Sequence, residues 1–285
     1  MKKILCGVIG VVVSVGTASA ADMAARPYTK APVAVAAVYD WTGFYVGGNI
    51  GYGWGGNTSP SISAVDPGNQ TGIGIFLSPA GFGPGATTGN LYPNQKPSGV
   101  FGGGQIGYDK QYSNWVLGFV ADIQAADFKA SGVALTGPAT GAFATESLSA
   151  KIDWFGTVRG KAGIAANDWL LYGTGGLAYG ETKSAIAFNC TPGGAGCDPV
   201  RIGYAGANSE VKAGWAAGAG VAKAFGNWNV GLEYLHIDLG RSSATATSTT
   251  GFFTTTTITA SQRFVEDTVR LTVNYKWGGA VVARY

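Results

Sequence analysis

The segment Val265–Trp277 reads VEDTVRLTVNYKW and decides the fold of this chain. Its apolar side chains fall on odd positions: Val265, Val269, Leu271, Val273, Tyr275 and Trp277. Its polar side chains fall on even positions: Glu266, Thr268, Arg270, Thr272 and Asn274. Because successive side chains of a β-strand point to opposite faces, the segment is predicted to be a strand with one apolar and one polar face.

Seven earlier segments show a similar period of two, although residues 169–181 are rich in glycine and their facing is ambiguous. The clearest is 151–164, where Ile152, Trp154 and Val158 share one face. Lys151, Asp153, Thr157, Arg159 and Lys161 share the other. The remaining five strands are expected at residues 44–54, 98–112, 115–124, 215–225 and 228–234.

The connections between these segments alternate between short and long. The short ones are Ser113-Asn114, Ala166-Asn167-Asp168 and Gly226-Asn227. The long ones are residues 55–97, 129–150, 182–211 and 237–263, and residues 242–259 could form a hairpin that extends the last two strands. Short periplasmic turns and long extracellular loops are typical of outer-membrane β-barrels. We therefore expect an all-β, eight-stranded antiparallel up-and-down transmembrane β-barrel, with a soluble secreted sandwich as the alternative.

The composition agrees with a lipid-facing surface. Only 12% of the residues are charged, about half the usual ~25%, and glycine supplies 47 of 285 residues, about twice the usual ~7%. No segment after the amino-terminal region is apolar over 18 residues, so no transmembrane helix is expected. Without such a helix, a closed barrel is the remaining structure that can span lipid, because it pairs every backbone N–H and C=O group.

The amino terminus is predicted to be an export signal. Lys2 and Lys3 precede an apolar stretch from Ile4 to Gly16, and cleavage is expected between Ala20 and Ala21. Residues 1–20 are then the signal peptide, 21–40 a flexible periplasmic lead-in and 41–285 the barrel. Without Lys2 and Lys3, 19 basic residues become 17 against 16 acidic ones, which gives no case for nucleic acid as a partner.

Several motifs together resemble one family. They are the segment 41–54 (WTGFYVGGNIGYGW), residues 154–160 (WFGTVRG), residues 171–180 (LYGTGGLAYG) and the ending 274–279 (NYKWGG). The chain resembles the small outer-membrane β-barrel proteins of alphaproteobacteria, the Brucella-type major outer-membrane proteins, which belong to the OmpA-like, porin family group. The resemblance implies the outer membrane of a Gram-negative bacterium, surface exposure and no catalysis.

Two features of the chain's ends and strands depart from that family's pattern. Lys223 lies where such proteins often carry an outward aromatic residue, and it could extend to water beside the Gly226-Asn227 turn. The chain also continues past Trp277 to Tyr285. The aromatic residue that the barrel-insertion machinery reads could therefore be Tyr275, Trp277 or Tyr285.

Aromatic residues gather at the ends of the predicted strands. Tryptophan and tyrosine at headgroup level form the girdles of membrane barrels. The tryptophans predicted to form these girdles are Trp41, Trp54, Trp115, Trp154, Trp169, Trp215, Trp228 and Trp277.

The polar faces carry charges of both signs. An eight-stranded barrel is just wide enough for side chains to fill it, and charges buried there should pair. We expect a salt-bridged plug, with a narrow polar pore as the alternative. The predicted network comprises Asp109, Asp122, Asp153, Arg159, Lys161, Glu233, Glu266 and Arg270.

Other motifs point to no cofactor or metal. Gly102, Gly104 and Gly107 match a dinucleotide-binding pattern, as do Gly173, Gly175 and Ala178 in variant form, but that site needs a following helix. His236, the single histidine, is expected at the solvated rim. Cys190 and Cys197 lie in one long loop, and export favours a disulfide between them.

These observations predict a structural, surface-exposed barrel that contributes to envelope integrity and is not an enzyme. The alternative is a small porin that gives limited passive diffusion of ions or small solutes. The expected partners are outer-membrane lipid, lipopolysaccharide and, during biogenesis, the insertion machinery.

Overall fold

A computed structural model describes residues 39–56, 60–65, 87–89, 96–136, 144–190, 203–249 and 255–277. The cleavage site at Ala20 and Ala21 lies outside these residues, as do Cys197 and Tyr285. The described residues form ten strands, and no helix among them is long and apolar enough to cross a membrane. The strands are β1 (Gly43–Gly55), β2 (Ser61–Val65), β3 (Thr87–Gly89), β4 (Ser98–Tyr112), β5 (Trp115–Thr136), β6 (Ala144–Ala166), β7 (Trp169–Cys190), β8 (Gly203–Phe225), β9 (Trp228–Ser248) and β10 (Thr257–Trp277).

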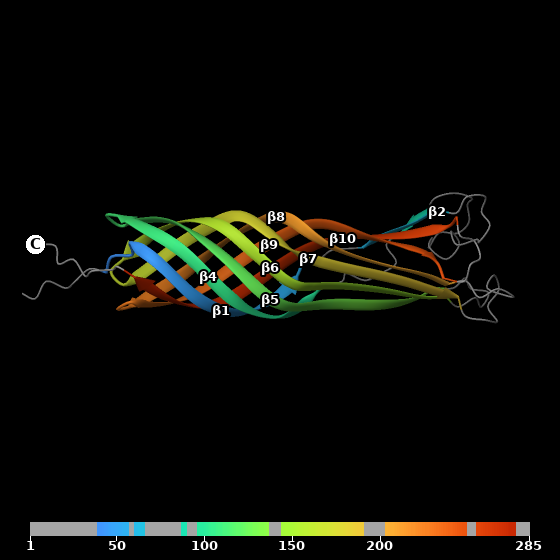
Figure 1. Cartoon of the computed structure of the whole chain (residues 1–285), viewed down its shortest axis with the longest axis horizontal. Helices are drawn as coiled ribbons and strands as arrows, with labels where there is room; N and C mark the ends of the chain where they lie inside the picture. Colours follow the sequence, from blue (N-terminus) through green and yellow to red (C-terminus); the bar gives the residue numbers. More distant parts are fainter. Residues whose placement is uncertain are drawn as a thin grey trace, which may run out of the picture. The chain divides into compact units, whose positions relative to one another are not determined.

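Eight of these strands close into a ring. The order is β1-β4-β5-β6-β7-β8-β9-β10, and β1 also pairs with β10 from Phe44↔Trp277 to Gly55↔Glu266. Every neighbouring pair is antiparallel, which confirms the predicted up-and-down barrel (Figure 1). The additional short strands β2 and β3 continue the sheet from the outer part of β10.

The three short turns connect the strand pairs that the sequence indicated. Ser113, Asn167 and Gly226 adopt positive φ angles of 59°, 56° and 61° at these turns, which lie together at one end of the barrel (Figure 1). A tight reversal between antiparallel strands favours such left-handed conformations, for which asparagine and glycine are suited.

Three of the four predicted long loops are largely strand, which corrects the boundaries given above. β5 continues to Thr136 and β6 starts at Ala144, so most of residues 129–150 form an extended hairpin. The same holds for β7 with β8 and for β9 with β10. Short side chains such as serine, threonine and alanine give little hydrophobic contrast there, which is why the period of two was weak in the sequence.

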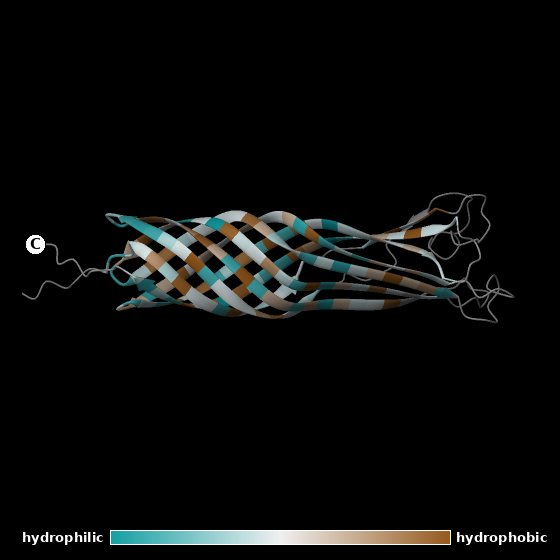
Figure 2. Cartoon of the chain, viewed as in Figure 1, coloured by the Kyte–Doolittle hydropathy of each residue, from teal (hydrophilic) through white to brown (hydrophobic). Residues whose placement is uncertain are grey.

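The outer face of the barrel is apolar over the part next to the short turns. Phe44 is 63% exposed, Ile50 65% and Leu171 66%, while their strand neighbours Asn49 and Tyr172 are buried. Figure 2 shows the resulting alternation of apolar and polar residues along the strands. Large apolar side chains are exposed on this scale where hydrocarbon, and not water, is the surrounding solvent.

Farther from the short turns, the pattern reverses. Leu148, Ala244 and Ile258 point inward and are at most 1% exposed. Their neighbours Ser149, Ser243 and Thr259 lie on the outer face. An apolar interior and a polar exterior are the arrangement expected in water. The strands of the barrel therefore extend from the hydrocarbon of the membrane into water.

Irregular pairing in β6 marks this change of solvent. The register shifts between Ile152 and Phe155, and both of these side chains are buried. One extra residue reverses the facing of everything beyond it. The predicted facing is therefore wrong for Lys151, Ile152 and Asp153, because Ile152 points inward while Lys151 and Asp153 project outward.

The facing of β10 can be tested at Leu271, an outward side chain that is 47% exposed at the middle of the segment 265–277. We expect Leu271→Arg to cost about 2–4 kcal/mol of folding free energy in a bilayer, because a charge at the midplane loses its hydration. The measurement is urea-dependent folding into lipid vesicles, followed by heat-modifiable migration on a gel. Ala207→Arg, on the outer face of the β8 extension, is the control and should fold normally. Equal stability of the two variants would contradict the assigned facing.

Candidate functional site

The middle of the barrel interior holds four charged side chains in contact. Arg159 Nη2 lies 3.0 Å from Asp122 Oδ2, and Arg159 Nη1 lies 3.1 Å from Glu233 Oε1. Arg270 Nη2 bridges the same two acids, at 3.1 Å from Asp122 and 2.5 Å from Glu233. The side chains come from β5, β6, β9 and β10, so this ion cluster ties opposite walls of the barrel together.

Hydroxyl groups make further hydrogen bonds to the side chains of the ion cluster. Thr157 Oγ1 donates to Asp122 at 2.8 Å and accepts from Arg159 Nε at 2.8 Å. The Tyr172 hydroxyl donates to Glu233 Oε2 at 2.9 Å. Arg159 and Arg270 are each 1% exposed. Two positive and two negative charges cancel, which is the condition under which buried ions are tolerated.

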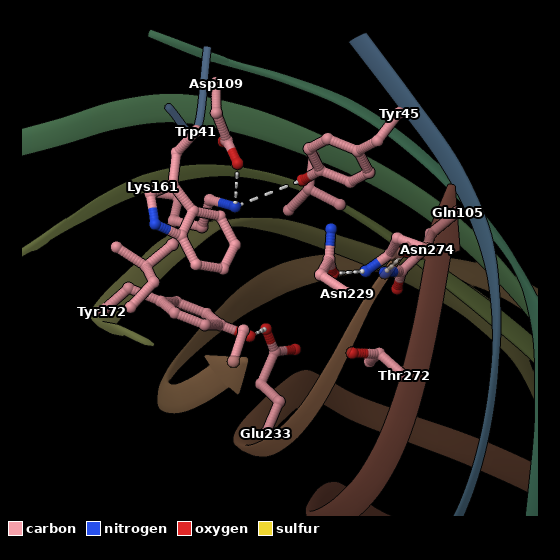
Figure 3. A pocket seen from close by; sticks show the side chains of 13 residues that line it. Trp41, Tyr45, Gln105, Asp109, Lys161, Tyr172, Asn229, Glu233, Thr272 and Asn274 are labelled. Atoms are coloured by element: carbon pink, nitrogen blue, oxygen red, sulfur yellow. Dashed lines mark hydrogen bonds and ion pairs between the residues drawn. The ribbon is translucent and has the colours of Figure 1, made fainter. Parts of the chain in front are cut away.

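A second ion pair lies between the ion cluster and the short turns. Lys161 Nζ donates to Asp109 Oδ2 at 2.6 Å and lies 5.0 Å and 5.2 Å from the ring centres of Tyr45 and Tyr172 (Figure 3). A cation between two aromatic faces is attracted by both rings. The ammonium group is thus held by one carboxylate and two rings.

Two glycines make room for these rings. A Cβ at Gly107 would lie 2.3 Å from the ring and hydroxyl of Tyr45, and one at Gly220 would lie 2.6 Å from those of Tyr172. Gly107 belongs to the first of the two dinucleotide-like motifs. The glycines of that motif lie on β4, and those of the second motif lie on β7. Glycine at 107 serves aromatic packing inside the barrel, as is common in strand interiors.

Amide side chains fill the remaining space beside this pair. Asn49 Nδ2 donates to Gln105 at 3.3 Å, Gln105 Nε2 donates to Asn274 at 2.6 Å, and Asn274 Nδ2 donates to Asn229 at 2.8 Å. The cavity bordered by Gln105, Asn229 and Asn274 measures about 20 Å³, room for about one water molecule. Figure 3 shows this packing.

Trp41 closes the end of the interior next to the short turns. It is 2% exposed and belongs to a buried cluster with Val116, Leu170 and Tyr172. The prediction that Trp41 belongs to the lipid-facing girdle is therefore wrong. It lies just before β1, where the chain has not yet joined the wall, so its ring can turn into the barrel. Its backbone N–H donates to Gln111 Oε1 at 2.8 Å.

A second apolar cluster closes the other side of the ion cluster. Phe101, Phe128 and Phe155 pack with ring centres 5.4–5.8 Å apart, together with Leu235, Ile237 and Phe264. The interior is therefore layered: an apolar stopper around Trp41, a polar and charged middle, and an aromatic layer.

Two residues predicted for the interior charge network do not join it. Asp153 pairs outside the barrel, with Lys151 and with Lys183 at 2.7 Å, because of the β6 irregularity. Glu266 points inward and is 2% exposed, yet neither carboxylate oxygen has a hydrogen-bond partner among the described residues. Glu266 lies four positions from Arg270, about 13 Å along a strand, which is too far for contact.

The other seven predicted girdle residues stand on the outer face. Six of them are 40–54% exposed: Trp54, Trp115, Trp169, Trp215, Trp228 and Trp277. Trp154 is half-buried and packs edge-on against Tyr179 with ring centres 6.2 Å apart.

No catalytic or metal-binding cluster forms among the residues that the structure describes. His236 Nδ1 contacts Asp267 Oδ1 at 2.8 Å on the outer face beside Trp215, and no nucleophile lies with it. No group of three histidine, cysteine, aspartate or glutamate side chains within the described ranges could hold a metal ion. Cys190 ends β7, and its proposed partner Cys197 lies outside the described residues.

The sequence reasoning placed Asn274 on a polar face but assigned no interior role to Tyr45, Tyr172 or the chain of amides. Tyr45 and Asn49 do alternate with the lipid-facing Phe44 and Val46, so inward facing was readable for β1. Tyr172 lies in the glycine-rich segment, whose pattern gives no facing.

Comparison with known proteins fits this geometry. The family model described as outer membrane protein beta-barrel domain matches residues 12–276. The chain belongs to this family. It is 32% identical over 287 residues to the 31 kDa outer-membrane immunogenic proteins of Brucella melitensis and Brucella suis, covering 97% of this chain and 100% of each relative.

Among solved structures, the chain is similar to the outer membrane protein OprG from Pseudomonas aeruginosa, with 10% identity and a TM-score of 0.42 over 84% of this chain and 98% of that one. It is also similar to Ail of Yersinia pestis, with 13% identity and a TM-score of 0.27 over 80% and 99% of the two chains.

The family and its relatives place the chain in the outer membrane of a Gram-negative bacterium. The protein is an alphaproteobacterial small outer-membrane β-barrel. In that setting the short turns face the periplasm and the extended hairpins face the cell exterior.

The ion cluster makes a testable contribution to stability. Arg159→Ala leaves Asp122 and Glu233 with one buried cation between them, and we expect a loss of about 3–5 kcal/mol. The measurement is the urea midpoint of unfolding from detergent micelles. Lys129→Ala is the control, because the side chains of Lys129 and of its partner Asp127 are 59% and 58% exposed. An unchanged midpoint for Arg159→Ala would show that the ion cluster does not hold the walls together.

Proposed function

We propose that this protein is a structural, surface-exposed barrel that contributes to the integrity of the outer membrane and does not conduct solutes. The observation that carries the proposal is the filled interior. The polar cavity beside Lys161 measures about 20 Å³ and holds about one water, and buried apolar clusters lie toward both ends of the interior. Barrels that form aqueous channels have roughly 16–18 strands.

The absence of catalysis is part of the same proposal. An enzyme would need an acid, a base or a nucleophile that converge on a substrate. Within the described ranges, the charges of the ion cluster neutralise one another, Glu266 is buried without a hydrogen-bond partner, and His236 and Asp267 pair on the outer face.

The surroundings of a structural barrel are its partners. The apolar band and its girdles fit outer-membrane lipid, with lipopolysaccharide in the outer leaflet, and the barrel-insertion machinery is the partner expected during assembly. The extended hairpins carry the polar outer faces that a surface-exposed protein needs.

Conductance tests the closed interior. We expect no discrete channels in planar bilayers, because the ion cluster and both apolar layers block the axis. A variant with Trp41, Asp122, Arg159, Glu233 and Arg270 all changed to alanine keeps the interior neutral and is the matched control for an opened barrel. Discrete conductance steps from the natural protein would favour the small porin and overturn the closed interior.

The structural role is tested in cells. We expect a strain that lacks this protein to admit more of a hydrophobic fluorescent dye, because the outer leaflet loses a packed protein component. Re-expression of the natural protein should restore the barrier, and the Leu271→Arg variant should not. A dye uptake that is the same with and without the protein would contradict a role in envelope integrity.

A further inference from the structure

Three lysines lie side by side on neighbouring strands of the extracellular extension. Lys129 of β5 is directly opposite Lys151 of β6, and Lys151 is directly opposite Lys183 of β7. Like charges placed directly across a sheet destabilise it. We call these residues the lysine row.

The lysine row faces outward from the barrel. Phe128, Ile152 and Thr182 precede or follow these lysines in the chain and are at most 1% exposed, pointing inward. The side chains of Lys129, Lys151 and Lys183 are 59%, 40% and 43% exposed. Three ammonium groups are therefore presented together to the surroundings of the barrel.

The height of the lysine row matches the headgroups of the outer leaflet. Lys151 lies three residues beyond Trp154, which is about 10 Å along a strand. Barrel strands tilt by about 35–45°, so the rise along the membrane normal is about 7–8 Å. The headgroup region extends about 5–8 Å beyond the hydrocarbon on each side. With Trp154 taken as the edge of the hydrocarbon, Lys151 lies at about the depth of the lipid phosphates, together with its partners in register, Lys129 and Lys183.

Acidic residues lie between the lysine row and the girdle. Lys129 Nζ is 2.5 Å from Asp127, Lys183 Nζ is 2.7 Å from Asp153 and 3.5 Å from Glu181, and Lys151 also contacts Asp153. Surface pairs of this kind contribute little to stability. Each ammonium group has three donors, so it can hold a carboxylate and a phosphate oxygen together.

A second pair of cations repeats the arrangement on the other side of the extension. Arg241 of β9 is directly opposite Arg263 of β10, and both side chains lie on the outer face beyond His236 and Asp267. At the periplasmic end, the outward Lys223 is instead isolated from other cations in its register and contacts Asp168 and the Trp169 ring. Grouped cations therefore lie on the side of the barrel where the outer leaflet is.

We propose that Lys129, Lys151 and Lys183 form a binding site for the phosphate groups of a glycolipid headgroup in the outer leaflet. The inference rests on the proposed lipopolysaccharide contact and names the residues that make it. Phosphate oxygens replace the repulsion between neighbouring ammonium groups with charge-assisted hydrogen bonds. The acidic residues between the lysine row and the girdle hold the lysine side chains in place through ion pairs.

Binding of diphosphoryl lipid A to the purified, detergent-folded full chain tests this site. Affinity is measured by native mass spectrometry with EDTA present, beside dephosphorylated lipid A and inorganic phosphate as comparison ligands. We expect the variant K129Q/K151Q/K183Q to bind about 100-fold more weakly, since each lysine near a charged membrane surface contributes about fivefold. The double variant K110Q/K223Q, which removes outward lysines at the periplasmic end, should bind like the natural protein.

Several outcomes would overturn the site. Equal affinity of the triple variant and the natural protein would reject the lysine row while leaving the lipopolysaccharide contact in place. Equal affinity for phosphorylated and dephosphorylated lipid A would reject phosphate recognition, and no binding of either form would reject the lipopolysaccharide contact itself. Competition by inorganic phosphate at the same concentration as lipid A would assign the site to free phosphate. In a parallel titration without EDTA, binding that requires added Mg²⁺ and is unchanged in the triple lysine variant would assign it to the acidic residues through a bridging cation.

A stability measurement separates binding from a merely structural role. Without glycolipid, K151Q should leave the thermal unfolding midpoint unchanged or raise it, because the central like charge is removed. With saturating diphosphoryl lipid A, the natural protein should gain more stability than K151Q, because ligand binding to the folded state stabilises it. A lower midpoint for K151Q without lipid and an equal gain with lipid would show that Lys151 is structural.

Discussion

The structure depends on one constraint: hydrocarbon cannot satisfy backbone N–H and C=O groups, so the sheet in the membrane must close on itself. The pairing of β1 with β10 removes the last free edges of the membrane-embedded ring. Once the ring is closed with eight strands, its circumference leaves room only for side chains. The inward residues of each strand then have to fill that space and neutralise one another, and the ion cluster of Arg159, Arg270, Asp122 and Glu233 is the result.

The same constraint ends where the membrane ends, and the wall responds there. In the membrane the outer face is apolar and the inner face polar; in the extracellular hairpins the relation is reversed. β10 achieves the reversal through its sequence, because its inward positions change from Ile258 and Phe264 to Glu266 and Arg270. β6 achieves the reversal through the irregular pairing at Asp153. Even-numbered residues face inward before it, as Ile152 does, and outward after it, as Val158 does. That reversal also turns Lys151 outward and completes the lysine row.

The interior is closed by residues with different chemistry at each level. Trp41 lies at the periplasmic end, Lys161 lies between two tyrosines above it, and a cluster of phenylalanines lies beyond the arginines. A closed interior and a charged outer rim both fit the proposed structural role, in which the surfaces of the barrel interact with the membrane.

The sequence by itself determined the barrel, because the period of two in segments such as 265–277 and the alternation of short and long connections are local properties of the chain. It also placed Arg159, Glu233 and Arg270 on inward faces. Only the tertiary structure decided which charges meet: Arg159 and Glu233 are 74 residues apart, and strand tilt and register bring them to one level. It likewise decided the facing of Asp153 and Trp41. Asp153 lies at an extra residue in β6, which reverses the alternation, and Trp41 lies just before β1, where the alternation has not begun.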